Sequence, residues 1–187
     1  RNPYAPVDKS GVVIDGLDIG RICFEIRQRG YSVVEDFLAL DDLERIRFAF
    51  NTEVPITEMR AIGTQTGRTW RAHNLLAKTR AADHVFLDPR LSAIVEGVIG
   101  KYHQLNITTL FNTLPGETKQ DLHQDDGLWP IPRPHPYFLC NCLIAFDEFT
   151  QDNGATHLVP FSHNRLDFVD QSVESIQVEM KSGSALF

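Results

Sequence analysis

His123 and Asp125 are the side chains best placed to bind a metal, because only one residue separates them. If that segment is extended, residues i and i+2 project from the same face, so an imidazole and a carboxylate converge on one point. Together with a distant second histidine, such a pair forms the facial triad of mononuclear non-haem Fe(II) oxygenases. The pattern alone is weak, since seven histidines and 25 acidic residues in 187 positions give about one match by chance. A surface or capping pair is the alternative interpretation.

The elements that must position this pair are helices first and short strands later. Asp18 and Gly30 bound one amphipathic helix. Asp41 can cap a second helix, and Asp88 followed by Pro89 opens a third. Extended segments are predicted at residues 31–37, 105–114, 137–149, 156–160, 175–180 and 184–187. Helices followed by antiparallel strands indicate an α+β fold in which helices flank a β-sandwich or barrel.

Composition narrows the class of protein. A chain of 187 residues with 42% hydrophobic content can form one compact domain, with a helical part at about 1–103 and a barrel part at about 104–187. The net charge of -7 argues against a nucleic-acid partner. No apolar run has membrane-spanning length, so we expect no membrane partner either.

The cysteines and the first residue bear on the compartment and on the extent of the chain. Cys23, Cys140 and Cys142 make a poor disulfide framework and are interpreted as buried, reduced thiols of a cytoplasmic protein. The chain begins at Arg1 with neither an initiator Met nor a signal-peptide pattern, so we expect residues ahead of it.

A larger, ordered set of residues surrounds the His-x-Asp pair. Residues 120–126 read QDLHQDD, Asn141 follows in the long apolar segment, and residues 153–163 read NGATHLVPFSH. This set resembles the phytanoyl-CoA dioxygenase family, and most closely the branch whose members oxidise natural products and other small apolar molecules. The combination is far more specific than His-x-Asp alone. The resemblance implies a double-stranded β-helix, a jelly-roll or cupin-like barrel with flanking helices.

The resemblance also implies roles for individual residues. His123 and Asp125 match the iron ligands, and we expect the third ligand, a histidine, after Phe187. The residues that match contacts to 2-oxoglutarate are Gln120, Thr156, Arg71 and Asn141. The expected substrate pocket includes Trp129, Ile131 and Phe111, and its apolar character favours a hydrophobic or amphipathic small molecule. The other histidines are interpreted as structural or as surface residues.

The end of the chain departs from the family pattern. Residues 183–187 match the segment that precedes the distal histidine, so we expect further C-terminal barrel strands beyond Phe187. The domain is therefore predicted to be incomplete, and the 187 residues taken by themselves are expected to be inactive because the third ligand and the 2-oxoglutarate arginine are absent.

The predicted activity is an Fe(II)-, 2-oxoglutarate- and O₂-dependent hydroxylation or desaturation of a small molecule, with release of succinate and CO₂. Two alternatives remain at this point. One is a non-catalytic β-barrel that binds small molecules and retains part of the metal motif. The other is a cupin-like metalloenzyme that needs no 2-oxoglutarate. The sequence leaves the oligomeric state open, with a homodimer among the options, and it does not name the substrate.

Overall fold

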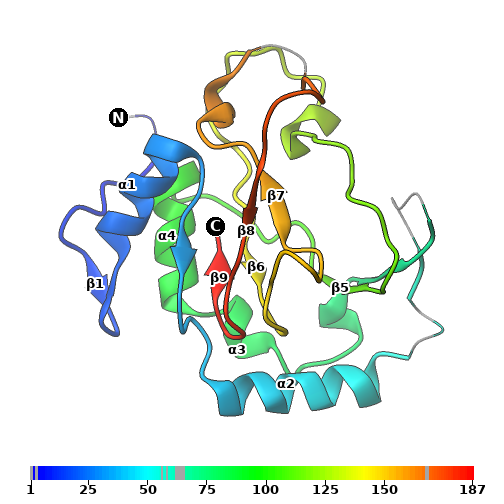
Figure 1. Ribbon diagram of the computed structural model, residues 1–187. Helices are drawn as coiled ribbons and strands as arrows, with labels where there is room; N and C mark the ends of the chain where they lie inside the picture. The colour runs from blue at the N-terminus through cyan, green and yellow to red at the C-terminus, as the bar shows by residue number, and fades with distance from the viewer. Residues whose placement is uncertain (1, 3, 56, 58, 62–65, 167–168) are drawn as a thin grey trace.

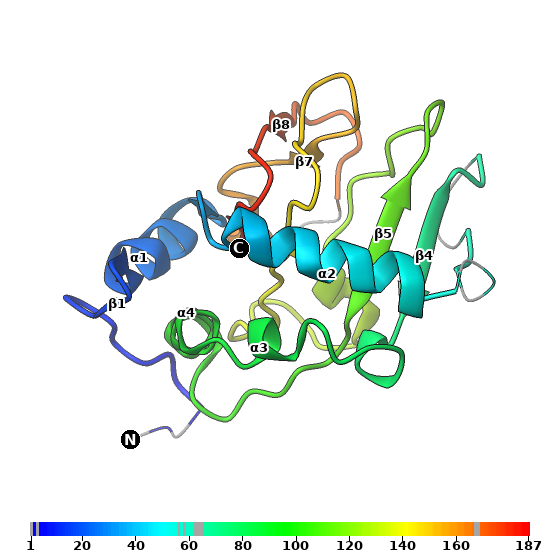
Figure 2. The ribbon, with the colours of Figure 1, turned by 90° about the horizontal axis from the view of Figure 1, so that it is seen from below.

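Helices α1 (Ile19–Arg29) and α4 (Pro89–Ile99) lie side by side in the computed structural model (Figures 1 and 2). The structure describes residues 2, 4–55, 57, 59–61, 66–166 and 169–187. Both helices begin where the sequence predicts, since Asp18 and Asp88 each accept a backbone N–H of the first turn. Gly30, with φ of +93°, ends α1 as predicted.

The contact between α1 and α4 depends on one small residue. A Cβ at Gly97 would lie 2.4 Å from the Cys23 sulfur, so only glycine permits this approach. Cys23 is fully buried there, and its thiol lies 3.6 Å from the Ile94 carbonyl oxygen. The prediction of a buried, reduced thiol at Cys23 is confirmed.

Helix α2 (Leu40–Glu53) begins slightly earlier than predicted. Ala39 occupies the cap position and makes no side-chain cap, whereas Asp41 lies inside the first turn. A carboxylate in the first turn still stabilises the helix, because it faces the positive end of the helix dipole. The predicted inner face is confirmed, since Ile46 and Phe50 are buried.

The remaining elements are short. The strands are β1 (Val13–Ile14), β2 (Leu17–Asp18), β3 (Val33–Val34), β4 (Thr69–His73), β5 (Thr109–Thr113), β6 (Leu143–Ile144), β7 (Thr156–Leu158), β8 (Ile176–Val178) and β9 (Ala185–Leu186). The short helices are η2 (Leu75–Ala77), α3 (Asp83–Phe86), η3 (Asp125–Leu128) and η4 (Ser162–Asn164).

Strand β9 lies at the centre of a three-stranded antiparallel sheet, between β3 and β6. Gly183 precedes it with φ of +88°, and a Cβ there would lie 2.7 Å from the Leu38 carbonyl oxygen. Phe187 follows it, exchanges two backbone hydrogen bonds with Ser32 and packs edge-on against Phe37 at 5.7 Å. The last residues of the chain are therefore part of the core.

The prediction of one long strand over residues 137–149 is wrong, because only β6 is a strand there. Tyr137 and Phe138 do not alternate between two faces of a sheet. Phe138 packs against Trp129, and the Tyr137 hydroxyl donates to Asn164. Apolar composition overstated the burial of this segment, since Tyr137 is exposed and Ala145 is its one buried residue. Loops rather than neighbouring strands provide the partners of Tyr137 and Phe138.

Three two-stranded antiparallel sheets complete the architecture: β1 with β2, β4 with β5, and β7 with β8. Strand β4 was not predicted, and it pairs with β5 from the part of the chain expected to form the barrel. The sheets thus combine strands from both sides of the division expected near residue 103. In Figure 1 the helices α1 and α4 lie to the left of the three-stranded sheet and α3 and α2 lie below it, while β1 lies on the outer side of α1.

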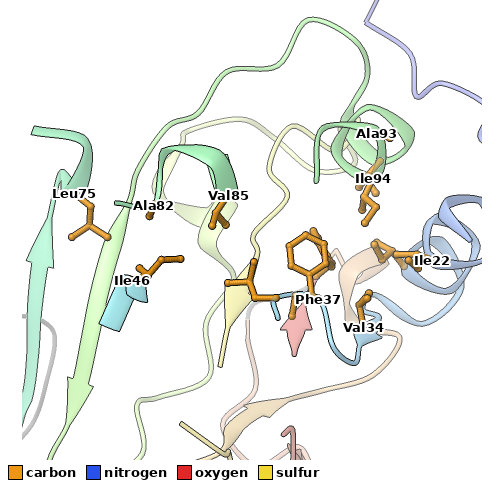
Figure 3. Close-up of a cluster of buried hydrophobic side chains, with 14 of the residues drawn as sticks. Ile22, Val34, Phe37, Ile46, Leu75, Ala82, Val85, Ala93 and Ile94 are labelled. Carbon is orange, nitrogen blue, oxygen red and sulfur yellow. The ribbon is translucent and has the colours of Figure 1, made fainter. Parts of the chain in front are cut away.

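The main core fills the space between these helices and the three-stranded sheet (Figure 3). Phe37 is at its centre, with Ile22 of α1 and Ile94 of α4 on one side. Val85 of α3 and Ile46 of α2 extend the cluster on the other side. Among the described residues, none of the helices has both the length and the apolar character needed to cross a membrane.

Candidate metal centre

His123 and Asp125 face one another, with 3.4 Å between the His123 Nε2 and an Asp125 carboxylate oxygen. The strand expected here is absent: His123 lies in irregular backbone, and Asp125 begins η3. Gln124 between them is nevertheless extended, with φ of -116° and ψ of 124°. One extended residue suffices to place its two neighbours on the same side. The predicted convergence therefore holds without the predicted sheet.

The hydrogen bonding of His123 leaves a metal-binding nitrogen toward Asp125. The His123 Nδ1 lies 2.8 Å from the Asp121 carbonyl oxygen, which can only accept, so Nδ1 carries the proton. In the neutral imidazole, Nε2 then carries the lone pair and faces the carboxylate. Metal-binding histidines commonly donate their other ring N–H to a backbone carbonyl in this way, which fixes the tautomer and the ring orientation.

The carboxylate of Asp125 is held on its other oxygen. The Asn141 side-chain amide donates to that oxygen, which leaves the first oxygen facing His123. Two acceptors that face each other repel unless a proton or a cation lies between them. About half of each side chain is exposed, at 59% for His123 and 50% for Asp125, so a metal ion has access. An imidazole and a carboxylate oriented in this way fit Fe(II).

A third metal ligand does not join the pair within the described part of the chain. No group of three His, Cys, Asp or Glu side chains with metal-binding geometry is present among those residues.

The residues predicted to contact 2-oxoglutarate occupy separate elements. Arg71, on β4, lies opposite Phe111 on β5, with its guanidinium carbon 4.8 Å from the ring centre. The Arg71 Nε is buried without a hydrogen-bond partner. Thr156 begins β7 and is half-buried, whereas Gln120 is exposed in the irregular segment before His123. Asn141 lies at the His–Asp pair, because its side-chain amide donates to Asp125.

The three residues predicted to form the substrate pocket, Trp129, Ile131 and Phe111, are partly exposed on the surface. Trp129 and Ile131 lie in the loop of residues 127–136 that follows Asp125, and both are partly exposed. Trp129 packs edge-on against Phe138 at 5.7 Å. Phe111 is also half-exposed, but it is partnered by Arg71.

Sequence reasoning missed an ionic cluster directly beside the pair. Asp126, the residue after Asp125, pairs with Arg133, and its other oxygen lies 3.4 Å from the His135 Nε2. His135 was interpreted as a residue without partners at ligand spacing. No spacing rule could have found this cluster, because a proline-rich loop brings its members together.

The histidines of residues 153–163 are structural, as interpreted from the sequence. The His163 Nε2 lies 3.1 Å from the Arg27 carbonyl oxygen near the end of α1, and His157 pairs with Ser175. The neighbouring Ser162 carbonyl accepts from the Gln124 side chain at 3.5 Å. His163 thus helps to anchor η4 to α1, and η4 in turn contacts Gln124, the residue between His123 and Asp125.

Solved structures share this fold. HygX from Streptomyces hygroscopicus, solved with nickel, 2-oxoglutarate and hygromycin B, is 15% identical with a TM-score of 0.67, over 89% of this chain and 75% of that one. SnoK, a non-heme alpha ketoglutarate dependent carbocyclase from nogalamycin biosynthesis, is 16% identical with a TM-score of 0.75, over 97% of this chain and 76% of that one. The likeness identifies the fold as the double-stranded β-helix of such oxygenases.

The chain belongs to the Phytanoyl-CoA dioxygenase (PhyH) family, whose profile matches residues 26–187. Dioxygenase trt7 of Aspergillus terreus is 27% identical over 150 residues, which cover 74% of this chain and 52% of the relative. Dioxygenase olcK of Penicillium canescens is 30% identical over 183 residues, which cover 86% of this chain and 59% of the relative. The chain therefore spans between 52% and 59% of the length of these two relatives.

Proposed function

We propose that the protein is an Fe(II)- and 2-oxoglutarate-dependent dioxygenase that hydroxylates or desaturates an apolar or amphipathic small molecule. The observation that carries the proposal is the His123–Asp125 pair, in which a nitrogen lone pair and a carboxylate oxygen face each other at 3.4 Å. Membership of the PhyH family and the dioxygenase names of relatives such as trt7 and olcK support it.

In this proposal the chain supplies two ligands and the groups that orient them. The His123 Nε2 and an Asp125 oxygen hold the metal, while the Asp121 carbonyl and the Asn141 amide fix the two side chains. When bound, iron(II) and 2-oxoglutarate supply the oxidising chemistry, and succinate and CO₂ are the co-products. The task of the protein is to keep one side of the metal open and to position the substrate carbon.

Arg71 is proposed to bind the co-substrate. A buried guanidinium N–H without a partner costs free energy, and an anionic ligand would satisfy it. Thr156 and Gln120 are proposed to contribute further hydrogen bonds to the same ligand. Asn141 is already bonded to Asp125, so we assign it first to holding the metal ligand.

Asp125 also limits the chemical outcome. Its carboxylate takes the metal position that halogenating relatives leave open for a halide, so the product is expected to be oxygenated or desaturated. The measurement is product mass spectrometry after turnover in chloride-containing buffer with any accepted substrate. A chlorinated product from the unmodified protein would contradict this assignment.

The proposed function is tested by anaerobic titration with Fe(II) and 2-oxoglutarate, followed by exposure to oxygen. The expected results are a metal-to-ligand absorption band and iron-dependent release of succinate. Small-molecule binding without succinate release would instead favour a non-catalytic binding protein. Iron-dependent oxygen consumption that needs no 2-oxoglutarate would favour a cupin-like metalloenzyme.

A further inference from the structure

The loop of residues 127–136 is tied back to η3, because two of its side chains contact Asp126. The Arg133 guanidinium pairs with the Asp126 carboxylate, and the His135 Nε2 lies 3.4 Å from the other Asp126 oxygen. We name these three residues the Asp126 clamp. Its side chains are largely buried, at 21% exposed for Asp126, 19% for Arg133 and 10% for His135. It therefore differs from the solvated ion pairs that contribute little on most protein surfaces.

Further contacts tie the clamp to its surroundings. A second Arg133 nitrogen reaches the Arg165 carbonyl oxygen at 3.4 Å. The His135 ring lies 5.0 Å from the ring of Phe138, and Phe138 in turn packs against Trp129. The clamp thus holds both ends of the loop, and the aromatic side chains fix its middle.

The loop of residues 127–136 is stiff. From residue 130 on, four prolines alternate with other residues, and each fixes its own φ and restricts the residue before it. These prolines are Pro130, Pro132, Pro134 and Pro136. Because the loop is stiff and the clamp holds both of its ends, the positions of the clamp residues determine where Trp129 lies.

We infer that the Asp126 clamp is a positioning device that makes the proposed metal ligand Asp125 and Trp129, which is predicted to line the substrate pocket, move as one unit. Asp126 directly follows Asp125 in η3, so holding Asp126 also sets the direction of the ligand. On the other side of the clamp, the loop carries Trp129. None of the three clamp residues touches the metal or the substrate in this scheme. The part of the inference that concerns Asp125 rests on the proposed function.

The test uses Asp126→Asn in the protein at its natural length. The 187 residues contain two tryptophans, so the background variant carries Trp70→Phe, and any tryptophan outside these residues is also replaced by phenylalanine. Acrylamide quenching then reports the accessibility of Trp129, and Fe(II) titration without co-substrate reports the metal site. We expect quenching to rise about twofold as the loop opens. Fe(II) affinity should weaken by about tenfold, the lower end for residues that orient a metal ligand.

Two further variants make the result specific. Asp147→Asn removes the same charge from an ion pair at 2.6 Å between Asp147 and Arg47 of α2. It should change neither readout. Arg133→Lys keeps the charge but loses the planar fork, so it should give intermediate values. It also provides the same readouts if Asp126→Asn does not fold.

The outcomes separate the clamp from the proposed function. Unchanged quenching in both clamp variants would overturn the inference, and so would increased quenching with unchanged Fe(II) affinity. If the unmodified protein binds no Fe(II), the proposed function fails instead. Quenching alone then decides whether the clamp holds Trp129.

Discussion

Two histidine–aspartate pairs, His123 with Asp125 and His135 with Asp126, share nearly the same geometry. Their two aspartates are adjacent in the sequence. In each, the ring Nδ1 lies beside a backbone carbonyl oxygen, at 2.8 Å for His123 and 3.0 Å for His135. In each, the ring Nε2 lies 3.4 Å from a carboxylate oxygen, of Asp125 in the first pair and of Asp126 in the second. Distance alone therefore does not distinguish a metal site from a structural pair.

The difference lies in charge compensation and access. Asp126 already has a cation, the Arg133 guanidinium, and its pair is largely buried. The other Asp125 oxygen accepts from the neutral Asn141 amide, and its pair is about half-exposed. Among the described residues, no arginine or lysine pairs with Asp125, whereas Arg133 pairs with Asp126. A histidine–aspartate pair should be judged as a metal site by the partner of its second carboxylate oxygen.

The largest expected effect comes from removing a proposed ligand of the half-exposed His123–Asp125 pair. His123→Ala or Asp125→Ala should abolish stoichiometric Fe(II) binding and turnover, because each removes one of two protein ligands in the described chain. Isothermal titration with Fe(II) under anaerobic conditions measures this. The matched control is His84→Ala, which breaks a surface pair with Asp42 at 2.7 Å and should leave binding unchanged. Full activity in His123→Ala would disprove the assignment.

A smaller effect is expected when the neutral partner is removed. Asn141→Leu keeps similar bulk but leaves the second Asp125 oxygen without its donor. Fe(II) affinity should weaken by up to about a hundredfold, as for other residues that orient a metal ligand. The same titration gives the number. Asn141→Asp adds a charge beside Asp125, and stronger binding in that variant alone would show that charge rather than orientation matters.

A third change concerns 2-oxoglutarate, which is proposed to bind beside the His123–Asp125 pair. Thr156→Val keeps the shape of the side chain and removes its hydroxyl. A hydrogen bond to a charged carboxylate contributes about 1.5–3 kcal/mol, so 2-oxoglutarate affinity should fall at least about tenfold. Anaerobic titration that follows the metal-to-ligand band measures the midpoint. Fe(II) affinity without co-substrate should stay the same, and an unchanged midpoint would leave Thr156 as a strand residue only.

The smallest expected effect on the metal site comes from the thiols near the core. Burial raises the pKa of Cys140 to about 12 and raises the pKa of Cys142 further. Because unfolded cysteines ionise near about pH 8.5, the folded state holds these protons more tightly. The stability is therefore fully present below about pH 8.5 and falls as the pH rises toward about 12. Urea midpoints at several pH values measure this, while Fe(II) binding below pH 8 should not respond to replacing Cys140 by Ala.

Local sequence rules predicted the helices well, because the interactions that start and stop a helix lie within one turn. Asp18 and Asp88 cap their helices as predicted, and Gly30 ends the first one. The same rules failed over residues 137–149. Strand formation there depends on distant partners. Strand β6 pairs with β9, and Phe149 makes only an isolated antiparallel bridge with Met180. Strand β4 was missed for the same reason, since its partner β5 lies about forty residues further along the chain.

The sequence by itself determined that His123 and Asp125 converge, because a single extended residue between them is enough to place both side chains on one side. The family pattern around them was likewise readable in the chain. Only the tertiary structure decided which carboxylate stays without a cation. Arg133 reaches Asp126 across a loop whose path no local rule gives, and Asn141 reaches Asp125 from sixteen residues away. Metal-binding chemistry here depends on charges brought together by folding, whereas the direction of the two ligands depends only on neighbouring bonds.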